Sequence, residues 1–210
     1  MREFSQDFQS ELSALMKWRR DVRHFKTDTV PQDLIQECLD VFQDAPSVGL
    51  SEPWRIVQLK TDASRQKALE NFQSANADAL ADYDGEKANL YASLKLSGMK
   101  DAPVQLAIFC EEDTPKGGGL GAQTMPEMRR YSVVAAIMTF WLKARAHGLG
   151  LGWVSILDPD QLRADLDVPN NWTLVAYLCM GYPQQETLTP ELETVGWEAR
   201  DPELTKVIER

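Results

Sequence analysis

The chain has 210 residues, 43% of them hydrophobic, and carries 22 basic against 32 acidic side chains, for a formal net charge of −10. This length and composition predict one globular domain over residues 1–210, with enough apolar side chains for a full core. The acidic balance argues against nucleic-acid binding, because a phosphate backbone requires a basic face. No stretch reaches the roughly 18 apolar residues of a membrane span and no apolar leader comes first, so we expect a cytoplasmic protein.

The first predicted element is an amphipathic helix that leads into a short basic run. Its apolar side chains recur at helical spacing and share one face: Phe4, Phe8, Leu12, Leu15 and Met16. The run that follows, residues 19–25, reads Arg-Arg-Asp-Val-Arg-His-Phe and reverses the overall charge locally. Guanidinium groups bind phosphate through paired hydrogen bonds, so the run predicts either an anion site or an exposed basic turn. The residues alone leave both open.

A second helix and a proline-rich loop come next. The helix is expected to start at Pro31 and to end before Pro46. Residues 44–54 contain two prolines, a glycine and two serines, together with apolar side chains that would hold the loop against the body. The hydroxyl and backbone N–H groups of this loop would suit a polar ligand, and a plain connection to a strand at 55–60 is the alternative.

The middle of the chain predicts helices, one buried strand and a glycine-rich segment. Residues 63–97 show a helical pattern broken near Gly85, and residues 102–110 form a short continuous apolar run typical of a buried strand. Residues 111–124 contain a glycine cluster that matches neither a P-loop nor a dinucleotide fingerprint. This segment is either a flap over a site or a surface loop.

The C-terminal half is expected to hold the most buried helix. Residues 131–146 are apolar on nearly all sides, which predicts a central helix or one in a subunit interface and makes a homodimer attractive. A glycine-rich turn, a strand at 153–157, a short helix after Asp158-Pro159 and a strand at 172–180 follow. Residues 184–210 have little periodicity and form an extension expected to lie along the body or a partner subunit.

Cysteine and histidine usage argues against a metal site. Cys38, Cys110 and Cys179 are an odd number of widely spaced residues, typical of reduced thiols in the core of a cytoplasmic protein. His24 and His147 belong to no His-Glu-x-x-His pattern. We therefore expect no metal.

The order of these elements resembles that of the flavin-binding nitroreductase superfamily. Four motifs carry the resemblance over nearly the whole chain: residues 19–25, 45–55, 124–132 and 150–159. The resemblance implies an α+β fold with a central, mostly antiparallel β-sheet flanked by helices, in an intertwined homodimer that binds FMN at the subunit interface.

Within that superfamily the first and last motifs are most similar to the 5,6-dimethylbenzimidazole synthases. These oxidoreductases use O2 to fragment reduced FMN into 5,6-dimethylbenzimidazole, the lower ligand of vitamin B12, and a four-carbon sugar phosphate. FMN is then a substrate, delivered as FMNH2 by a separate flavin reductase. The residues that the resemblance assigns to FMN binding are Arg19, Arg20, Asp21, Val22, Arg23, Ser47, Ser155 and Arg200.

The resemblance also assigns the chemistry to Asp21 and Ser155. A carboxylate beside the ribityl chain can move protons as C–H and C–C bonds break, and a hydroxyl can donate or accept at the flavin ring. The structural alternatives are an ion pair that orients the arginines, for Asp21, and a strand-end hydroxyl, for Ser155. Two other functions remain open: an NAD(P)H-dependent FMN nitroreductase or flavin reductase, and a flavin-binding protein without activity.

Overall fold

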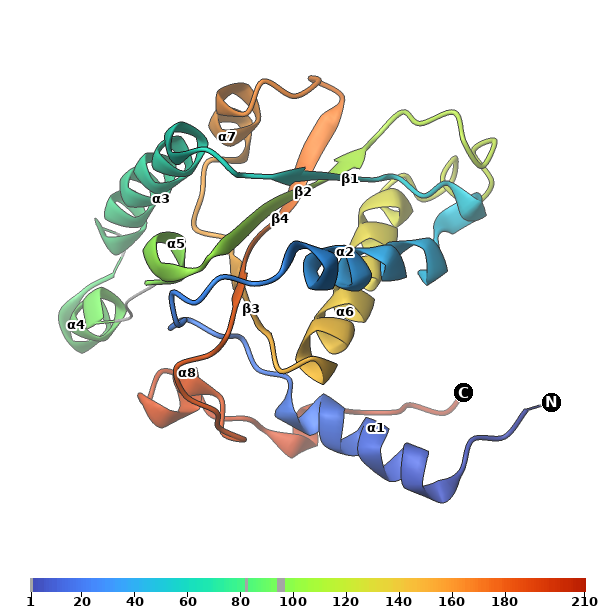
Figure 1. Cartoon of the computed structure of the whole chain (residues 1–210), viewed down its shortest axis with the longest axis horizontal. Helices are drawn as coiled ribbons and strands as arrows, with labels where there is room; N and C mark the ends of the chain where they lie inside the picture. The colour runs from blue at the N-terminus through green and yellow to red at the C-terminus, as the bar shows by residue number, and fades with distance from the viewer. Residues whose placement is uncertain (1, 82, 94–96) are drawn as a thin grey trace.

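The sheet at the centre of the molecule has four antiparallel strands. The structure is a computed structural model that describes residues 2–81, 83–93 and 97–210. Its strands are β1 (Trp54–Gln58), β2 (Val104–Glu111), β3 (Gly150–Val154) and β4 (Trp172–Gly181), in the order β1-β2-β4-β3 (Figure 1). Every neighbouring pair is antiparallel, so the predicted α+β class and mostly antiparallel sheet are confirmed.

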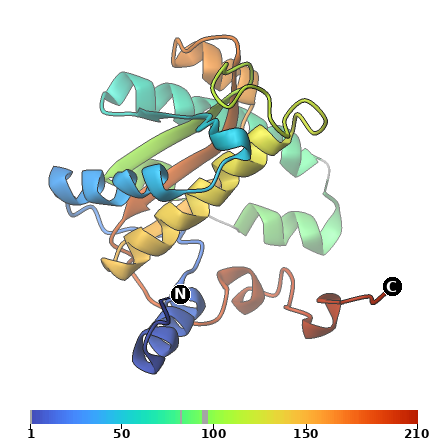
Figure 2. The same cartoon turned by 90° about the vertical axis from the view of Figure 1, so that its right-hand side faces the viewer.

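Helices cover both faces of this sheet. The described helices are α1 (Gln6–Trp18), α2 (Gln32–Asp40), α3 (Asp62–Ala81), α4 (Gly85–Ser93), α5 (Gly98–Asp101), α6 (Met128–Ala146), α7 (Pro159–Asp165) and α8 (Glu191–Thr194). The α2 and α6 helices pack on one face, whereas α3, α5 and α7 pack on the other (Figures 1 and 2).

Strand alternation explains why β2 reads as a continuous apolar run. Leu106 and Ile108 face the core under α2 and α6, while Ala107 and Phe109 face the core under α3 and α7. Successive side chains of a strand point to opposite faces, so a strand covered on both sides needs apolar residues throughout.

The basic run lies along β3 and the end of β4. Asp21 forms a parallel bridge with Leu151, and the Val22 N–H donates to the Leu151 carbonyl at 2.9 Å. Phe25 is buried and forms an antiparallel bridge with Pro183. The chain therefore holds these residues by main-chain hydrogen bonds at the ends of two strands.

The α1 helix does not pack as its amphipathic face requires. It has no buried residue, and Phe4, Phe8 and Met16 are exposed. Figures 1 and 2 show α1 and the C-terminal tail set apart from the helices that cover the sheet. The contacts of α1 with α6 leave these three side chains uncovered within the described part of this chain.

Some predicted element bounds are corrected. Strand β3 begins at Gly150 and ends at Val154, earlier than the predicted 153–157, because its glycines pair with β4 although they carry no side chain. Ser155 consequently lies just beyond the strand. Pro31 caps α2 instead of starting it, and α6 begins at Met128. The helical stretch predicted over 63–97 divides into α3 and α4, and its residues 82 and 94–96 lie outside the described residues.

Candidate active site

All four predicted site arginines line one cavity. Arg19, Arg20 and Arg23 arrive from the end of α1, and Arg200 arrives from the C-terminal extension. The cavity has a volume of about 190 Å³, and Asp21, Pro190, Glu191 and Leu192 complete its lining. Arginine side chains from two segments far apart in sequence thus line one cavity, an arrangement whose charge would favour an anion.

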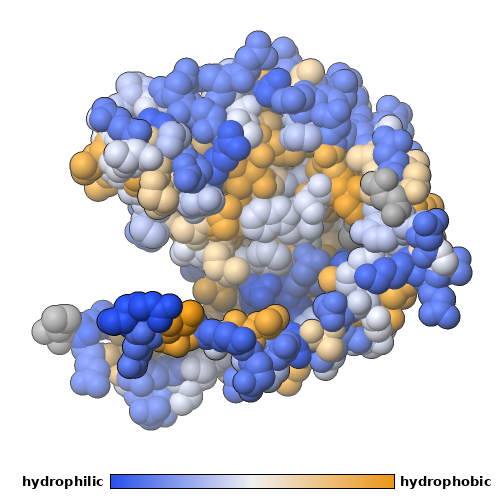
Figure 3. Space-filling view, turned by 180° about the vertical axis from the view of Figure 1, so that it is seen from behind, coloured by the Kyte–Doolittle hydropathy of each residue, from blue (hydrophilic) through white to orange (hydrophobic). Residues whose placement is uncertain are grey.

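A larger cavity adjoins the first. Its volume is about 460 Å³, and it shares Arg20, Asp21, Arg23 and Glu191 with the smaller one. Figure 3 shows a broad hollow between the body and the lower segment that carries the N-terminus. Together the two cavities form one two-lobed site with a strongly cationic end.

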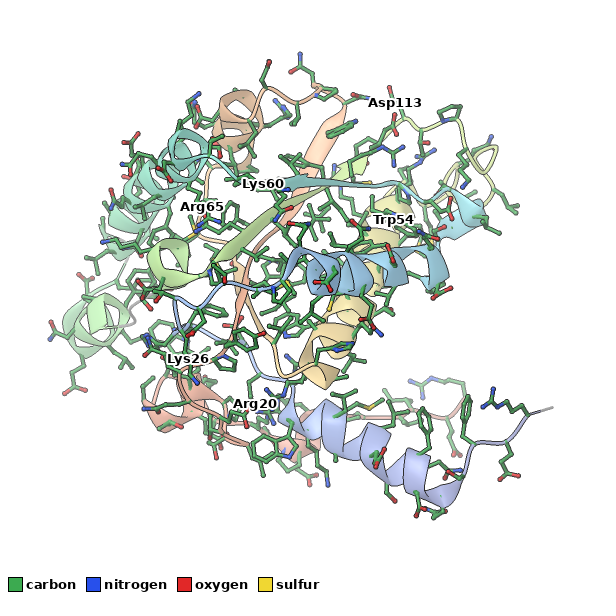
Figure 4. All side chains as sticks on the ribbon, viewed as in Figure 1. Arg20, Lys26, Trp54, Lys60, Arg65 and Asp113 are labelled. Carbon is green, nitrogen blue, oxygen red and sulfur yellow. The ribbon has the colours of Figure 1, made fainter. Side chains whose placement is uncertain are left out.

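Main-chain carbonyls fix the side chain of Arg20. Its Nε donates to the Leu188 carbonyl at 2.9 Å, and its terminal nitrogens donate to the carbonyls of Arg19 and Lys17. The guanidinium, labelled in Figure 4 beside the end of α1, is thereby held at the cavity wall. Burial and the charges of Arg200 and Arg19 lower the pKa of Arg20, and a bound anion would relieve that repulsion.

Asp21 places a carboxylate inside this cationic site. Its Oδ1 accepts the backbone N–H of Trp153 at 2.8 Å, and its Oδ2 lies 3.7 Å from Nε of Arg23. The side chain keeps 41% of its surface exposed. Burial of its other side raises the pKa of the carboxyl, although the Trp153 N–H and Arg23 act in the opposite direction. The geometry gives Asp21 a fixed direction and a proton affinity above that of an ordinary carboxylate.

Arg23 and His24 connect the site to the start of α5. Ser97 Oγ donates to the Arg23 carbonyl at 3.1 Å and lies 3.0 Å from Nδ1 of His24. Nε2 of His24 lies 3.7 Å from Oε1 of Glu191. The histidine therefore bridges the α5 segment and the C-terminal extension beside the arginines.

Two site residues at the C-terminal end of α6 were not predicted. Trp141 lies under the Arg19 guanidinium, 5.0 Å from it, and Arg145 binds Glu186 at 2.8 Å and lies over Trp18. Trp18, Trp141 and Arg145 all line the larger cavity. A basic residue in the last turn of an apolar helix was the only sequence signal.

The structure does not bring Ser47 and Ser155 into these cavities. Ser47 Oγ accepts the Glu52 N–H at 3.1 Å near the N-terminal end of α6, and Ser155 is exposed beyond β3. Among the described residues of one chain, neither serine lines either cavity. Ser155 does follow Trp153, whose N–H binds Asp21, by two residues.

The glycine-rich segment 111–124 packs on the loop that contains Ser47. The space for a β-carbon on Gly117 is filled by the Gly49 carbonyl, and Lys116 pairs with Glu52. The segment therefore lies at the Ser47 end of the molecule, and within one chain it does not line the cavities at the arginines.

No other chemistry is visible in the described structure. The three cysteines are free and buried, and burial raises the pKa of Cys110 and Cys179 to about 12. Among the described residues, no group of His, Cys, Asp or Glu side chains is arranged to hold a metal ion. None of the described helices has the length and apolar composition needed to cross a membrane.

Comparison with known proteins identifies the family. The model of the nitroreductase family matches residues 16–182, which include Arg19, Arg20 and Arg23, all four strands and α6. The chain belongs to the nitroreductase family. The predicted membership is thus confirmed, and Arg200 lies in the C-terminal extension beyond the matched residues.

Two curated relatives share more than 40% of their aligned residues with this chain over nearly its whole length. A 5,6-dimethylbenzimidazole synthase of Rhodospirillum rubrum is 51% identical over 199 residues, covering 95% of this chain and 94% of its own length. A protein of the same name from Rhodobacter capsulatus is 43% identical and covers 95% and 96%. These identities confirm the resemblance that the motifs indicated.

Solved structures support the nitroreductase fold. An iodotyrosine deiodinase in complex with FMN and 3-iodo-L-tyrosine has a TM-score of 0.73 at 22% identity, covering 95% of this chain and 97% of that one. A BluB-like flavoprotein of Clostridium difficile has a TM-score of 0.70 at 21% identity, covering 94% and 99%. At these identities the similarity establishes the architecture.

Proposed function

We propose that this protein is a 5,6-dimethylbenzimidazole synthase that fragments reduced FMN with O2, releasing dimethylbenzimidazole and a four-carbon sugar phosphate. The observation that carries the proposal is the carboxylate of Asp21, held by the Trp153 N–H within the arginine cluster. The near-full-length identity to the synthases of two other bacteria supports it.

The two-lobed site suits FMN chemically. The arginines at its cationic end supply several charge-assisted donors for a phosphate dianion, while Trp18, Trp141 and backbone groups line the remainder. In this proposal Arg19, Arg20, Arg23 and Arg200 bind the phosphate and ribityl chain, together with the main chain at Val22. Reduced FMN supplies the electrons for O2 and the carbon atoms of the product.

Asp21 takes the role of proton carrier. Its raised pKa makes the carboxylate a better base than a solvent-exposed one, and its hydrogen bond to Trp153 fixes its direction. A carboxylate also repels the negatively charged phosphate of FMN, so binding of FMN does not by itself explain an aspartate at this position. Ser155, two residues beyond Trp153, would donate to or accept from the flavin ring.

A second copy of the chain would complete the site. Ser47 and the flap at 111–124 lie away from the arginines within one chain, and an interface would bring the partner's equivalents to the flavin. The exposed apolar faces of α1 and α6 support an intertwined homodimer. The single domain over 1–210, its C-terminal extension, the cytoplasmic location and a separate reductase for FMNH2 belong to the same proposal.

The test is to mix the purified protein with chemically reduced FMN and air, without NAD(P)H, and to measure dimethylbenzimidazole by mass spectrometry. Wild type should form the product, and Asp21→Asn should form at least about 100-fold less, in line with loss of a positioned acid or base. Asp28→Asn changes an exposed carboxylate outside the cavities and serves as the matched control.

Recovery of intact FMN with wild type would contradict the proposal. Bleaching of a yellow protein by NAD(P)H would then favour a nitroreductase or flavin reductase. Flavin binding without either reaction would favour a flavin-binding protein.

A further inference from the structure

Glycines form the surface against which the Asp21 segment lies. A β-carbon built on Gly152 would lie 2.1 Å from the Val22 carbonyl oxygen, and one on Gly150 would lie 2.6 Å from Cγ2 of Val22. A β-carbon on Gly98 would lie 2.9 Å from the ring of Phe25. We call Gly98, Gly150 and Gly152 the glycine trough.

Backbone conformation does not explain these glycines. Gly148 and several loop glycines have positive φ, but Gly98, Gly150 and Gly152 do not. Glycine inside a strand weakens it, because it adds flexibility to the unfolded chain and offers no side chain to pack. The close approach of residues 22–25 is therefore the physical reason for the trough.

The closest of these approaches lies between two hydrogen bonds that hold Asp21. On one side of Gly152 the Leu151 carbonyl accepts the Val22 N–H at 2.9 Å, and on the other the Trp153 N–H binds Asp21 Oδ1 at 2.8 Å. A methyl group at position 152 would push the Val22 carbonyl away, and both hydrogen bonds would lengthen together.

We propose that Gly150 and Gly152 are positioning residues for the carboxylate of Asp21. They act through Val22, by letting its main chain lie directly on β3. The expected effect on product yield rests on the proposed synthase activity, whereas the placement of Asp21 by these two glycines does not depend on it.

The two glycines are expected to respond differently to a change at Val22. The obstacle to a methyl group on Gly150 is the Val22 side chain; Val22→Ala leaves its Cβ at 3.1 Å, a contact that a shift of a few tenths of an ångström relieves. The obstacle at Gly152 is a main-chain oxygen, which Val22→Ala does not remove. This difference tests whether the contacts with Val22 are the cause, and the yield per FMNH2 oxidised then separates misplacement of Asp21 from a loss of stability.

The first experiment measures dimethylbenzimidazole formed per FMNH2 oxidised. Gly152→Ala should lower this yield about 100-fold, the loss typical of a misplacement near 1 Å. Gly150→Ala should lower it in the native background but not in the Val22→Ala background, whereas Gly152→Ala should lower it in both. The yield of Val22→Ala alone is the reference for the double variants.

Gly148→Ala is the matched control from the same glycine run. Its φ of +76° makes alanine unfavourable, while its β-carbon would meet nothing within 4 Å. This variant should therefore lose thermal stability and keep its product yield. An equal fall in yield for Gly148→Ala, or no relief of Gly150→Ala by Val22→Ala, would overturn the proposal.

A second readout needs no flavin. Labelling with ¹⁵N-tryptophan gives six backbone amides, and Asp21→Ala identifies that of Trp153 by moving its proton resonance. Gly152→Ala should move it in the same direction and by a comparable amount, well beyond the small effect of a changed neighbouring residue, and Gly148→Ala should not move it. If the Trp153 resonance stays in place in Gly152→Ala, the positioning role is refuted. If it moves as expected, the role is supported, and both results hold even when the wild-type protein forms no dimethylbenzimidazole.

Discussion

The carboxyl group of Asp21 sits where its charged form is costly to the fold. Burial raises the pKa of this group, and the nearby carboxylate of Glu191 adds to that effect, although Arg23, Arg19 and the Trp153 N–H favour the anion. Such a balance is common at functional sites, where a group is kept for reactivity instead of stability. Stability and activity should therefore move in opposite directions when Asp21 is neutralised.

Asp21→Asn should raise the melting temperature of the protein at neutral pH. Because the folded-state pKa lies above the unfolded value, the stabilising state is the protonated one. That stabilisation is complete below the unfolded pKa and is lost as pH rises through the folded pKa. Wild type and variant should converge in acid, as thermal melts across pH would show, with Asp28→Asn following wild type. A lower melting temperature for Asp21→Asn at neutral pH would contradict this account.

Several residues that line the candidate site could be predicted from the sequence and others could not. The basic run signalled an anion site because its charge opposed that of the chain, and Arg200 followed from the family resemblance. Trp141 and Arg145 were missed because they join the site only through the packing of α6 on α1. Gly150 and Gly152 were assigned to a turn because glycine interrupts the apolar pattern of a strand. The structure needs glycine at both positions because Val22 packs directly against them.

At the scale of elements, an aromatic cluster connects α4 to the C-terminal extension. Tyr83 and Tyr91 stack at 4.9 Å, and the ring of Trp197 meets both, at 5.7 and 6.3 Å. The Trp197 N–H donates to the Leu192 carbonyl at 2.8 Å, which turns the extension back toward the arginines. The cluster thereby anchors the segment that presents Arg200.

Trp197→Ala should weaken binding of FMN and leave binding of riboflavin nearly unchanged, because riboflavin lacks the phosphate that Arg200 is proposed to bind. Aromatic contacts of this kind contribute about 0.5–1.5 kcal/mol each, so the dissociation constant for FMN should rise roughly tenfold. Titration calorimetry would measure it, with Trp197→Phe as the control that keeps a ring. Equal losses for both flavins would show that Trp197 does not act through the phosphate end.

Element prediction succeeded where periodicity was strong and failed at glycine. The buried helix predicted at 131–146 is α6, and one side of it is covered by β2, β3, β4 and α2. Strand β3 was placed three residues late because Gly150 and Gly152 interrupt the apolar pattern. The break between α3 and α4 followed from Gly85, whose φ is +60°.

At the scale of the whole molecule, α6 retains an uncovered apolar row. Tyr131, Val134 and Met138 follow at helical spacing and are 54%, 41% and 41% exposed. Together with the exposed Phe8 and Met16 of α1, this row is apolar surface of the kind that marks an interaction site. Burial against a second copy is the simplest solution, because like surfaces meet across a two-fold axis.

Val134→Glu should shift a dimer toward monomers and weaken FMN binding with it, since a buried, unpaired carboxylate is strongly unfavourable. Sedimentation velocity would report the subunit state, and flavin titration the affinity. Gln73→Glu adds the same charge on the exposed side of α3 and should change neither. An unchanged dimer in Val134→Glu would exclude this face of α6 from the interface.

The position of residues 21 and 22 has a consequence for solubility. In the strand order β1-β2-β4-β3, β3 is an edge strand, and unpaired N–H and C=O groups at an edge invite pairing with another molecule. The Val22 N–H donates a hydrogen bond to the Leu151 carbonyl, and the Trp153 N–H donates one to the Asp21 carboxylate, so these two edge groups are already paired. The segment proposed to carry the chemistry also blocks aggregation through β3, so changes that loosen it act on solubility and on the site at once.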